Sequence, residues 1–260
     1  MKSLVQDLRA AGCVFAEEEA DLLTAAARDE EHLAQLLARR VRGEPLEHVV
    51  GWADFLGLRL EVGAGAFVPR RRSEFLVREA VALTAPGAVV LDLCCGVGAL
   101  GALVAASVPG GVELHAADLD PGPLAYARRN VAPYGGAVWQ GDLYDALPAS
   151  LRGRVDVMVV NAPYVPTSEI PLLPPEARDH EPPLSLDGGA DGLHLHRRIA
   201  AGAVQWLAPG GHLLIETSTR QSPRTAASLA AAGLTPREAT SDAYDATIII
   251  ATGPGRDRSA

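Results

Sequence analysis

The chain has 260 residues, enough to bury a sizeable core as one large domain or as one domain with a small appendage. Hydrophobic residues make up 48% and charged residues 21%, which is typical of a folded globular protein. The 23 Lys and Arg residues against 32 Asp and Glu residues give a net charge of −9, which argues against duplex nucleic acid as a partner. No cysteine or histidine spacing indicates a disulfide framework or a metal site. No signal peptide or long apolar run occurs, so we expect a cytoplasmic protein without a membrane span.

Residues 1–48 predict a small helical domain. Residues 1–42 are expected to form two helices, and the second runs from Glu17 to Arg40 with its leucines and alanines at helical spacing. Short apolar runs broken by glycines between Val49 and Val68 predict a β-hairpin, which would link the helices to a second domain over residues 69–260.

From about residue 75 onward, apolar strands alternate with helices. The predicted strands are Ala88–Leu93, Val112–Ala117, a short one around Val138–Trp139, Val155–Val160, His212–Glu216 and Ala246–Ala251. The predicted helices between them are Val77–Leu83, Ala99–Ala106, Pro123–Asn130, Ile199–Leu207 and Ala226–Ala232. This alternation predicts an α/β fold with a mainly parallel sheet covered on both faces. Residues 163–183 hold seven prolines without periodicity and predict a binding loop.

A loop of small residues follows the first of these strands and leads into a helix, where a ligand can approach the backbone closely. The residues expected to hold a ligand there are Asp92, Cys94, Cys95, Gly96, Val97 and Gly98. Asp118, at the end of the next strand, can accept both hydroxyls of a ribose, and Leu119 follows it. Further along, Asp142 can accept an adenine amino group and Leu143 can cover the ring. Asn161 completes the set of residues that are expected to bind the cofactor.

Two cofactors suit this loop. Residues 96–101 match the Gly-x-Gly-x-x-Gly fingerprint of dinucleotide-binding proteins. The same residues, with Asp92 ahead of them, match the acid-x-small-x-Gly-x-Gly pattern of class I methyltransferases. An acid at Asp92 would attract the ammonium group of S-adenosyl-L-methionine and repel a pyrophosphate, which favours the first of these ligands. A glycine-rich turn that serves only packing is the remaining interpretation.

The segment Asn161–Tyr164 follows the strand Val155–Val160, where ligands bind in doubly wound sheets. The Asn161 carboxamide oxygen and the Ala162 carbonyl can accept both hydrogens of an NH2 group and turn its nitrogen toward an electrophilic methyl group. Pro163 fixes the backbone, and Tyr164 offers a flat wall for a planar substrate. The segment therefore predicts methylation of an amide-like nitrogen, although an ordinary Asn-x-Pro turn is the alternative.

From Arg40 to Thr252 the sequence resembles the HemK/PrmC family of protein-(glutamine-N5) methyltransferases. The residues that carry the resemblance are Gly43–Leu46, Gly51, Phe67–Arg70, Ser73–Glu74, Leu91–Leu93, Asp118, Gly141–Leu143, Asn161–Tyr164, Glu181–Pro182, Leu186–Leu193 and Leu207–Gly211. The sequence departs from the family at Ala162, usually proline, at Cys94–Cys95, usually Gly-Thr, and in a shorter helical segment at the start.

The resemblance implies a Rossmann-like, seven-stranded class I methyltransferase sheet behind a small helical domain. It implies that Asn161, Ala162, Pro163 and Tyr164 hold the side-chain amide of a glutamine in a peptide-chain release factor. It also implies that Phe67 and Arg70 line the same pocket, with S-adenosyl-L-methionine as the cofactor.

Alternatives remain for the methyl acceptor and for the reaction. The shorter helical segment is compatible with a free amino acid or another small nitrogen compound as the acceptor. An N6-adenine methyltransferase uses a similar clamp, but the net charge of −9 argues against it. A nicotinamide-dependent oxidoreductase and an inactive cofactor-binding module are the remaining alternatives.

Overall fold

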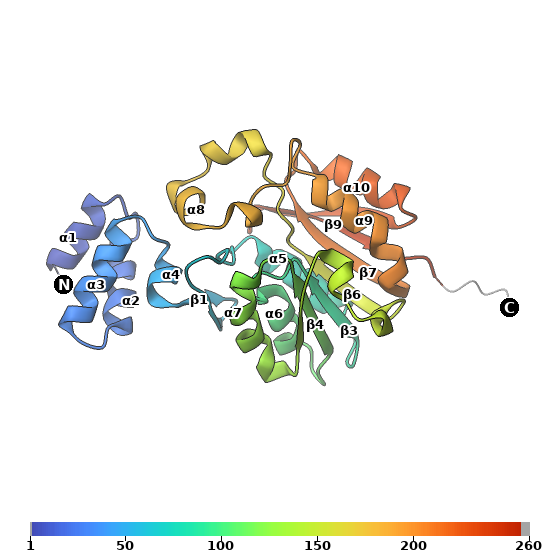
Figure 1. The fold of residues 1–260 in the computed structure, drawn as a ribbon, viewed down its shortest axis with the longest axis horizontal. Helices are drawn as coiled ribbons and strands as arrows, with labels where there is room; N and C mark the ends of the chain where they lie inside the picture. The colour runs from blue at the N-terminus through green and yellow to red at the C-terminus, as the bar shows by residue number, and fades with distance from the viewer. Residues whose placement is uncertain (1, 256–260) are drawn as a thin grey trace.

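A computed structural model describes residues 2–255 of the chain (Figure 1). Helices α1–α3 lie at one end of the molecule, and the large sheet with its covering helices makes up the other end. The predicted division at residues 48 and 68 stays a prediction, and the last residues of the predicted second domain, 256–260, lie outside the described part. No helix within residues 2–255 is both long and apolar enough to cross a membrane.

The helical region is built from α1 (Lys2–Ala10), α2 (Ala16–Ala26), α3 (Glu30–Val41) and the short α4 (Leu46–Val50). The prediction of one helix from Glu17 to Arg40 is wrong, because residues 27–29 are not helical and separate α2 from α3. Asp29 is extended there, and its side chain accepts a hydrogen bond from the backbone N of His32 at 2.7 Å, which starts a new helix. The apolar side chains of these helices form their own cluster, which contains Leu4, Leu8, Ala16, Ala20, Leu23, Leu36 and Val49.

The predicted hairpin is present as β1 (Trp52–Phe55) and β2 (Leu58–Glu61), which pair in antiparallel register. Leu56 and Gly57 form its turn with φ angles of 50° and 78°. Asn130, in α7 (Pro121–Val131), fixes the hairpin against the small-residue loop. Its Oδ1 accepts from the backbone N of Glu61 at 2.8 Å, and its Nδ2 donates to the backbone O of Val97 at 2.9 Å.

The large sheet has seven strands in the order β5-β4-β3-β6-β7-β9-β8, which confirms the predicted class of fold. The strands are β3 (Val89–Leu93), β4 (Glu113–Asp118), β5 (Ala137–Gln140), β6 (Val155–Val160), β7 (Leu207–Thr217), β8 (Thr235–Ser241) and β9 (Ala246–Thr252). The five strands β5, β4, β3, β6 and β7 run parallel to one another, and β9 runs antiparallel to both β7 and β8.

Helices cover both faces of the sheet (Figure 1). Helices α5 (Ser73–Leu83), α6 (Ala99–Ser107) and α7 pack on one face, together with the hairpin. Helices α9 (His194–Trp206) and α10 (Ser222–Ala231) pack on the other. Because the chain moves outward from β3 to β5 and then returns to β6, the strand order reverses between β3 and β6.

The proline-rich segment contains short helices: η4 (Thr167–Leu172), α8 (Pro175–His180) and η5 (Pro183–Ser185). The expectation of a segment without periodic structure is therefore wrong in detail, because proline is well tolerated in the first turn of a helix. Further 3-10 turns occur at η1 (Ala132–Tyr134), η2 (Leu143–Ala146) and η3 (Ala149–Leu151).

Candidate active site

A cavity of about 590 Å³ opens at the carboxyl ends of β3, β4 and β6, where the strand order reverses. Part of its wall comes from the proline-rich segment, through residues such as Pro174 and Ala177. The predicted site residues in the wall are Phe67, Arg70, Cys94, Cys95, Gly96, Val97, Asp118, Leu119, Asp142, Leu143, Asn161, Ala162, Pro163 and Tyr164. Asp92 and Gly98 lie outside the wall, so the fold brings together all but two of the predicted residues.

The small-residue loop carries backbone strain at the cavity. Cys94 has a φ of 60°, a left-handed conformation that costs a residue with a side chain roughly 1 kcal/mol or more. Gly96, with a φ of 53°, adopts the same region without that cost, and a Cβ there would face open space. Burial raises the pKa of both cysteine thiols, so the pair is held as thiols inside the fold.

Asp92 lies behind this loop. Its side chain is fully buried, and its Oδ2 accepts a hydrogen bond from the backbone N of Gly101 at 2.8 Å. Burial raises its pKa to about 8, and the nearby charge of Asp118 adds to that rise. Asp92 lies outside the cavity wall, and its direct contact with a cofactor stays a prediction. The carboxyl group instead fixes the first turn of α6 under the loop.

Asp118 ends β4 with both carboxylate oxygens engaged by backbone groups. Its Oδ2 accepts from the N of Gly96 at 2.8 Å, and its Oδ1 accepts from the N of Asp120 at 2.9 Å. Burial raises its pKa, while these N–H groups act in the opposite direction. The carboxylate is thus held at one angle, and its remaining lone pairs are available to a diol.

Asp142 and Leu143 form another part of the wall. Asp142 Oδ2 accepts from Arg198 at 2.9 Å. Leu143 is buried and has a φ of 49°, so its backbone is strained in the same sense as that of Cys94. The exposed Leu119 adds a second apolar side chain to the wall. An acceptor beside apolar side chains suits a purine that carries an amino group.

The wall fits S-adenosyl-L-methionine better than a dinucleotide. Near the loop the wall carries the carboxylates of Asp118 and Asp142, the second of them paired with Arg198. These carboxylates suit hydroxyl and amino hydrogens, and Asp118 suits a positively charged sulfonium group. A pyrophosphate would be repelled by these charges. It would also need the backbone N of Gly96, which already donates to Asp118.

The Asn161–Tyr164 segment leaves β6 at the same end of the sheet. The Nδ2 of Asn161 donates to the Oγ of Ser73 in α5 at 3.2 Å. Among the described residues, no hydrogen bond reaches the Oδ1 of Asn161 or the backbone O of Ala162. Both residues line the cavity. Two residues of the cavity wall therefore each carry a carbonyl-type oxygen that accepts no hydrogen bond within the described residues.

Glu216, at the end of β7, organises the side chains around this segment. It is buried, and its Oε2 accepts from the Oγ of Ser73 at 2.5 Å. Its Oε1 accepts from the hydroxyl of Tyr164 at 3.0 Å and from the Nε of Arg72 at 3.2 Å. Burial and the neighbouring Glu216 charge raise the pKa of Tyr164, so its hydroxyl stays a donor. Neither residue was among the predicted site residues, although Glu216 ends a predicted strand and Ser73, the first residue of α5, belongs to the segments that carry the family resemblance.

Phe67 and Arg70 lie at the cavity as the resemblance implies. The guanidinium of Arg70 lies 4.8 Å from the centre of the Phe67 ring and donates to the Oε1 of Glu181 at 2.6 Å. The same Oε1 accepts from the backbone N of Val68 at 3.1 Å. Burial raises the pKa of Glu181. This contact fastens the end of the proline-rich segment to the chain before α5.

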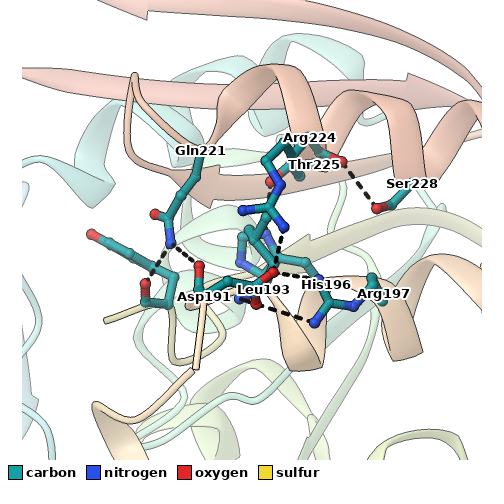
Figure 2. A network of polar contacts seen from close by, with 9 residues as sticks. Asp191, Leu193, His196, Arg197, Gln221, Arg224, Thr225 and Ser228 are labelled. Carbon is teal, nitrogen blue, oxygen red and sulfur yellow. Dashed lines mark hydrogen bonds and ion pairs between the residues drawn. The ribbon is translucent and has the colours of Figure 1, made fainter. Parts of the chain in front are cut away.

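A polar network joins α9 and α10 (Figure 2). Gln221 Nε2 donates to the backbone O of Tyr164 at 2.9 Å and to that of Asp191 at 3.2 Å. His196 is buried with its Nδ1 3.0 Å from the Oγ1 of Thr225, and burial lowers its pKa to about 4. The His196 ring lies edge-on to the Tyr164 ring, with the two ring centres 6.4 Å apart.

Comparison with known proteins gives the family. The family described as "Methyltransferase small domain" matches residues 71–171. A release factor glutamine methyltransferase of Mycolicibacterium smegmatis is 42% identical over 198 residues, which cover 75% of this chain and 68% of the relative. A 4-amino-L-phenylalanine/4-methylamino-L-phenylalanine methyltransferase of Streptomyces pristinaespiralis is 38% identical over 192 residues, which cover 70% of this chain and 64% of the relative. The chain thus spans about two thirds of the length of these relatives.

Among solved structures, a methyltransferase from Pyrococcus furiosus shares the fold, with a TM-score of 0.59 and 16% identity over 85% of this chain and 99% of that one. The aligned relatives, the sheet order and the two free acceptors after β6 lead to one assignment. The chain belongs to the release factor glutamine methyltransferase family.

Proposed function

We propose that this protein transfers a methyl group from S-adenosyl-L-methionine to the side-chain amide nitrogen of a glutamine in a peptide-chain release factor. The observation that carries the proposal is the pair of free acceptors, Asn161 Oδ1 and Ala162 O, at the carboxyl end of β6. A primary amide presents two N–H donors in one plane, which this pair can satisfy together.

The chain's own residues would align and polarise the acceptor. Asn161 Oδ1 and Ala162 O hold the two hydrogens, so the face of the nitrogen is directed away from them and into the cavity. As the nitrogen bonds to the methyl carbon, the bond from that carbon to sulfur breaks and the nitrogen gains positive charge. These oxygens stabilise that charge until the nitrogen releases one of its two protons to water. S-adenosyl-L-methionine, held by the loop and Asp118, supplies a methyl group that is already activated on a sulfonium sulfur.

Ala162 replaces the first proline of the family's usual segment without removing the carbonyl group. It is 1% exposed, so a buried methyl group occupies the place of a ring. Pro163 follows directly and restricts the backbone of Ala162 to extended conformations. The direction of the Ala162 carbonyl is therefore supported from the residue after it.

A second acceptor class has support from one relative. The Streptomyces pristinaespiralis methyltransferase, named for 4-amino-L-phenylalanine, is 38% identical to this chain, while the Mycolicibacterium smegmatis release factor enzyme is 42% identical. An arylamine also carries an NH2 group that the two acceptors can hold. Sequence identity alone does not separate these acceptors.

A direct competition separates them. Purified protein and radiolabelled S-adenosyl-L-methionine are incubated with a purified release factor, with the same factor carrying a Gln→Ala change at each candidate glutamine, and with 4-amino-L-phenylalanine. The proposal expects label on the unchanged factor and none on the factor that lacks the acceptor glutamine. Label confined to the arylamine would contradict it and assign the small-molecule function.

A further inference from the structure

We propose that Glu216 acts through Ser73 to determine which end of the Asn161 carboxamide faces the cavity. This positioning role rests on the proposed function, because it concerns the acceptor that would bind the substrate NH2 group. It adds two positioning residues, Glu216 and Ser73, to the methyl-transfer machinery. The contacts run from β7 through α5 to the end of β6.

The direction of each hydrogen bond follows from the donors available. Glu216 receives donors from Ser73, Tyr164 and Arg72 and has no hydrogen of its own to give as a carboxylate. The single hydroxyl hydrogen of Ser73 is therefore committed to Glu216 at 2.5 Å. Ser73 Oγ then has only lone pairs left for a third group.

Asn161 must meet those lone pairs with its NH2 end. Its Nδ2 lies 3.2 Å from the Ser73 Oγ, and the reversed carboxamide would bring two acceptors together. Its Oδ1 is consequently the end of the carboxamide that is not bonded to Ser73, and Asn161 and Ala162 both line the cavity. A carboxamide that flipped would present a donor to the substrate's donor, and binding of the NH2 group would fail.

Burial makes this arrangement selective. Glu216 and Ser73 are each 2% exposed, so water does not replace a mismatched partner. Asn161 and Ser73 both line the cavity, and the Oδ1 of Asn161 accepts no hydrogen bond among the described residues. The buried Glu216–Ser73 pair therefore fixes the orientation of the Asn161 carboxamide, and the oxygen of that carboxamide accepts from the substrate.

The Glu216→Gln variant removes the charge while keeping shape. A glutamine side chain can donate to Ser73, which frees the hydroxyl hydrogen to donate to Asn161 and lets the carboxamide reverse. We expect kcat for the glutamine acceptor to fall by roughly 10- to 100-fold, while the Kd for S-adenosyl-L-methionine changes by less than about 3-fold. Ser73→Ala should show a similar loss, and Ser73→Thr, which keeps the hydroxyl, should recover most of the activity.

The relative affinity for an amide and a carboxylate at the acceptor position is a measurement that a general structural defect would leave unchanged. A release factor with Gln→Glu at the acceptor position presents acceptors where the natural side chain presents donors. Wild-type protein should bind this analogue much more weakly than the unmodified factor. In Glu216→Gln the ratio of the Kd for this analogue to the Kd for the unmodified factor should fall by roughly 10-fold, because the reversed carboxamide offers a donor to the analogue's carboxylate.

The matched control is Glu79→Gln, in the same helix as Ser73 and paired with Arg237 at the surface, which should leave all of these constants unchanged. A Glu216→Gln protein with wild-type kcat and undiminished discrimination would overturn the inference.

The orientation can also be read without any methyl acceptor, which separates this inference from the proposed function. In wild-type protein, nuclear Overhauser contacts should connect the Nδ2 protons of Asn161 with the Cβ protons of Ser73. Their absence would overturn the inference even if methyl transfer occurs. Their presence in a protein that methylates no release factor would refute the proposed function alone.

Discussion

Asn161 is the side chain on which the proposed chemistry depends most, because its Oδ1 is one of two free acceptors at the cavity. We expect Asn161→Ala to lower kcat/KM for the methyl acceptor by roughly 10²- to 10³-fold, as is typical for loss of one aligned polar group in a reaction centre. Binding of S-adenosyl-L-methionine, measured by calorimetry, should stay nearly unchanged because Asp118 and the loop are intact.

A control for this variant is Gln205→Ala, which removes an exposed amide that pairs with Arg152 on the surface. It should alter neither constant. If Asn161→Ala lost cofactor binding together with activity, Asn161 would belong to the cofactor site and the acceptor role would be wrong.

His196 gives the protein a predictable sensitivity to acid. Burial, assisted by the charge of Arg197, lowers its pKa to about 4 from the usual 6.5. Between these values the unfolded chain binds a proton that the folded chain excludes, so stability is lost as the pH falls through this window. The size of the loss is about 3 kcal/mol, since each pKa unit corresponds to about 1.4 kcal/mol.

Urea unfolding at several pH values tests this. His196→Gln should lose about 3 kcal/mol less than the wild type between pH 6.5 and 4. The same change at His194, which is exposed, should leave the pH dependence as it is. Equal acid sensitivity of His196→Gln and wild type would show that other groups control it.

Residue types predicted the site better than they predicted its internal contacts. Asp118 and Asn161 follow strands that end at the site, so position along the chain was enough to place them at the cavity. Asp92 is buried outside the cavity wall, which the strand pattern could not show because it does not indicate the face of the loop that a carboxylate takes. The Ser73–Glu216 contact joins residues 143 positions apart in the sequence. It depends on the packing of α5 beside β7, which the sequence pattern does not predict.

At the scale of elements, buried apolar runs were predicted most accurately. β6 is apolar at nearly every position, and its predicted bounds, Val155–Val160, are the observed ones. β8 (Thr235–Ser241) was missed because it is an edge strand of mostly polar, partly exposed residues. The break between α2 and α3 was missed because leucines keep the same spacing across it, while the decisive signal was the capping Asp29.

Helix α6 packs on β3 only because Gly101 has no side chain. A Cβ at this position would lie 2.9 Å from both the Asp92 Cβ and the Leu114 Cδ1. We expect Gly101→Ala to destabilise the protein by about 1–3 kcal/mol, because overpacking outweighs the better helix propensity of alanine. Thermal denaturation measures the effect. Gly255→Ala, which meets nothing within 4 Å, is the matched control, and equal melting temperatures would contradict the packing argument.

At the scale of the whole molecule, Arg40 links the helical region to the cavity wall. It is buried in α3, donates to Glu19 of α2 at 2.5 Å, and donates to Glu176 of α8 at 2.6 Å. Glu176 and its neighbour Ala177 line the cavity. One guanidinium group therefore connects the first helices to the proline-rich segment.

Removing this link should affect both stability and the protein acceptor. Arg40→Leu leaves Glu19 buried without a partner, which we expect to cost about 3 kcal/mol in chemical unfolding. It should also raise KM for a protein substrate while leaving the Kd for S-adenosyl-L-methionine unchanged, because the cofactor loop lies on other elements. Arg42→Leu, an exposed arginine that follows the same helix, should change stability by less than about 0.5 kcal/mol. An unchanged KM in Arg40→Leu would show that the link has no part in substrate binding.

The central claim is that a carboxamide nitrogen is the methyl acceptor. The most direct test is tandem mass spectrometry of a release factor treated with this protein and S-adenosyl-L-methionine, with fragments that locate the added methyl group. The account predicts one methyl group on the side-chain nitrogen of a single glutamine, absent when Asn161→Ala replaces the wild type. A methyl group on another residue type, or an unmodified factor beside a methylated small amine, would contradict it.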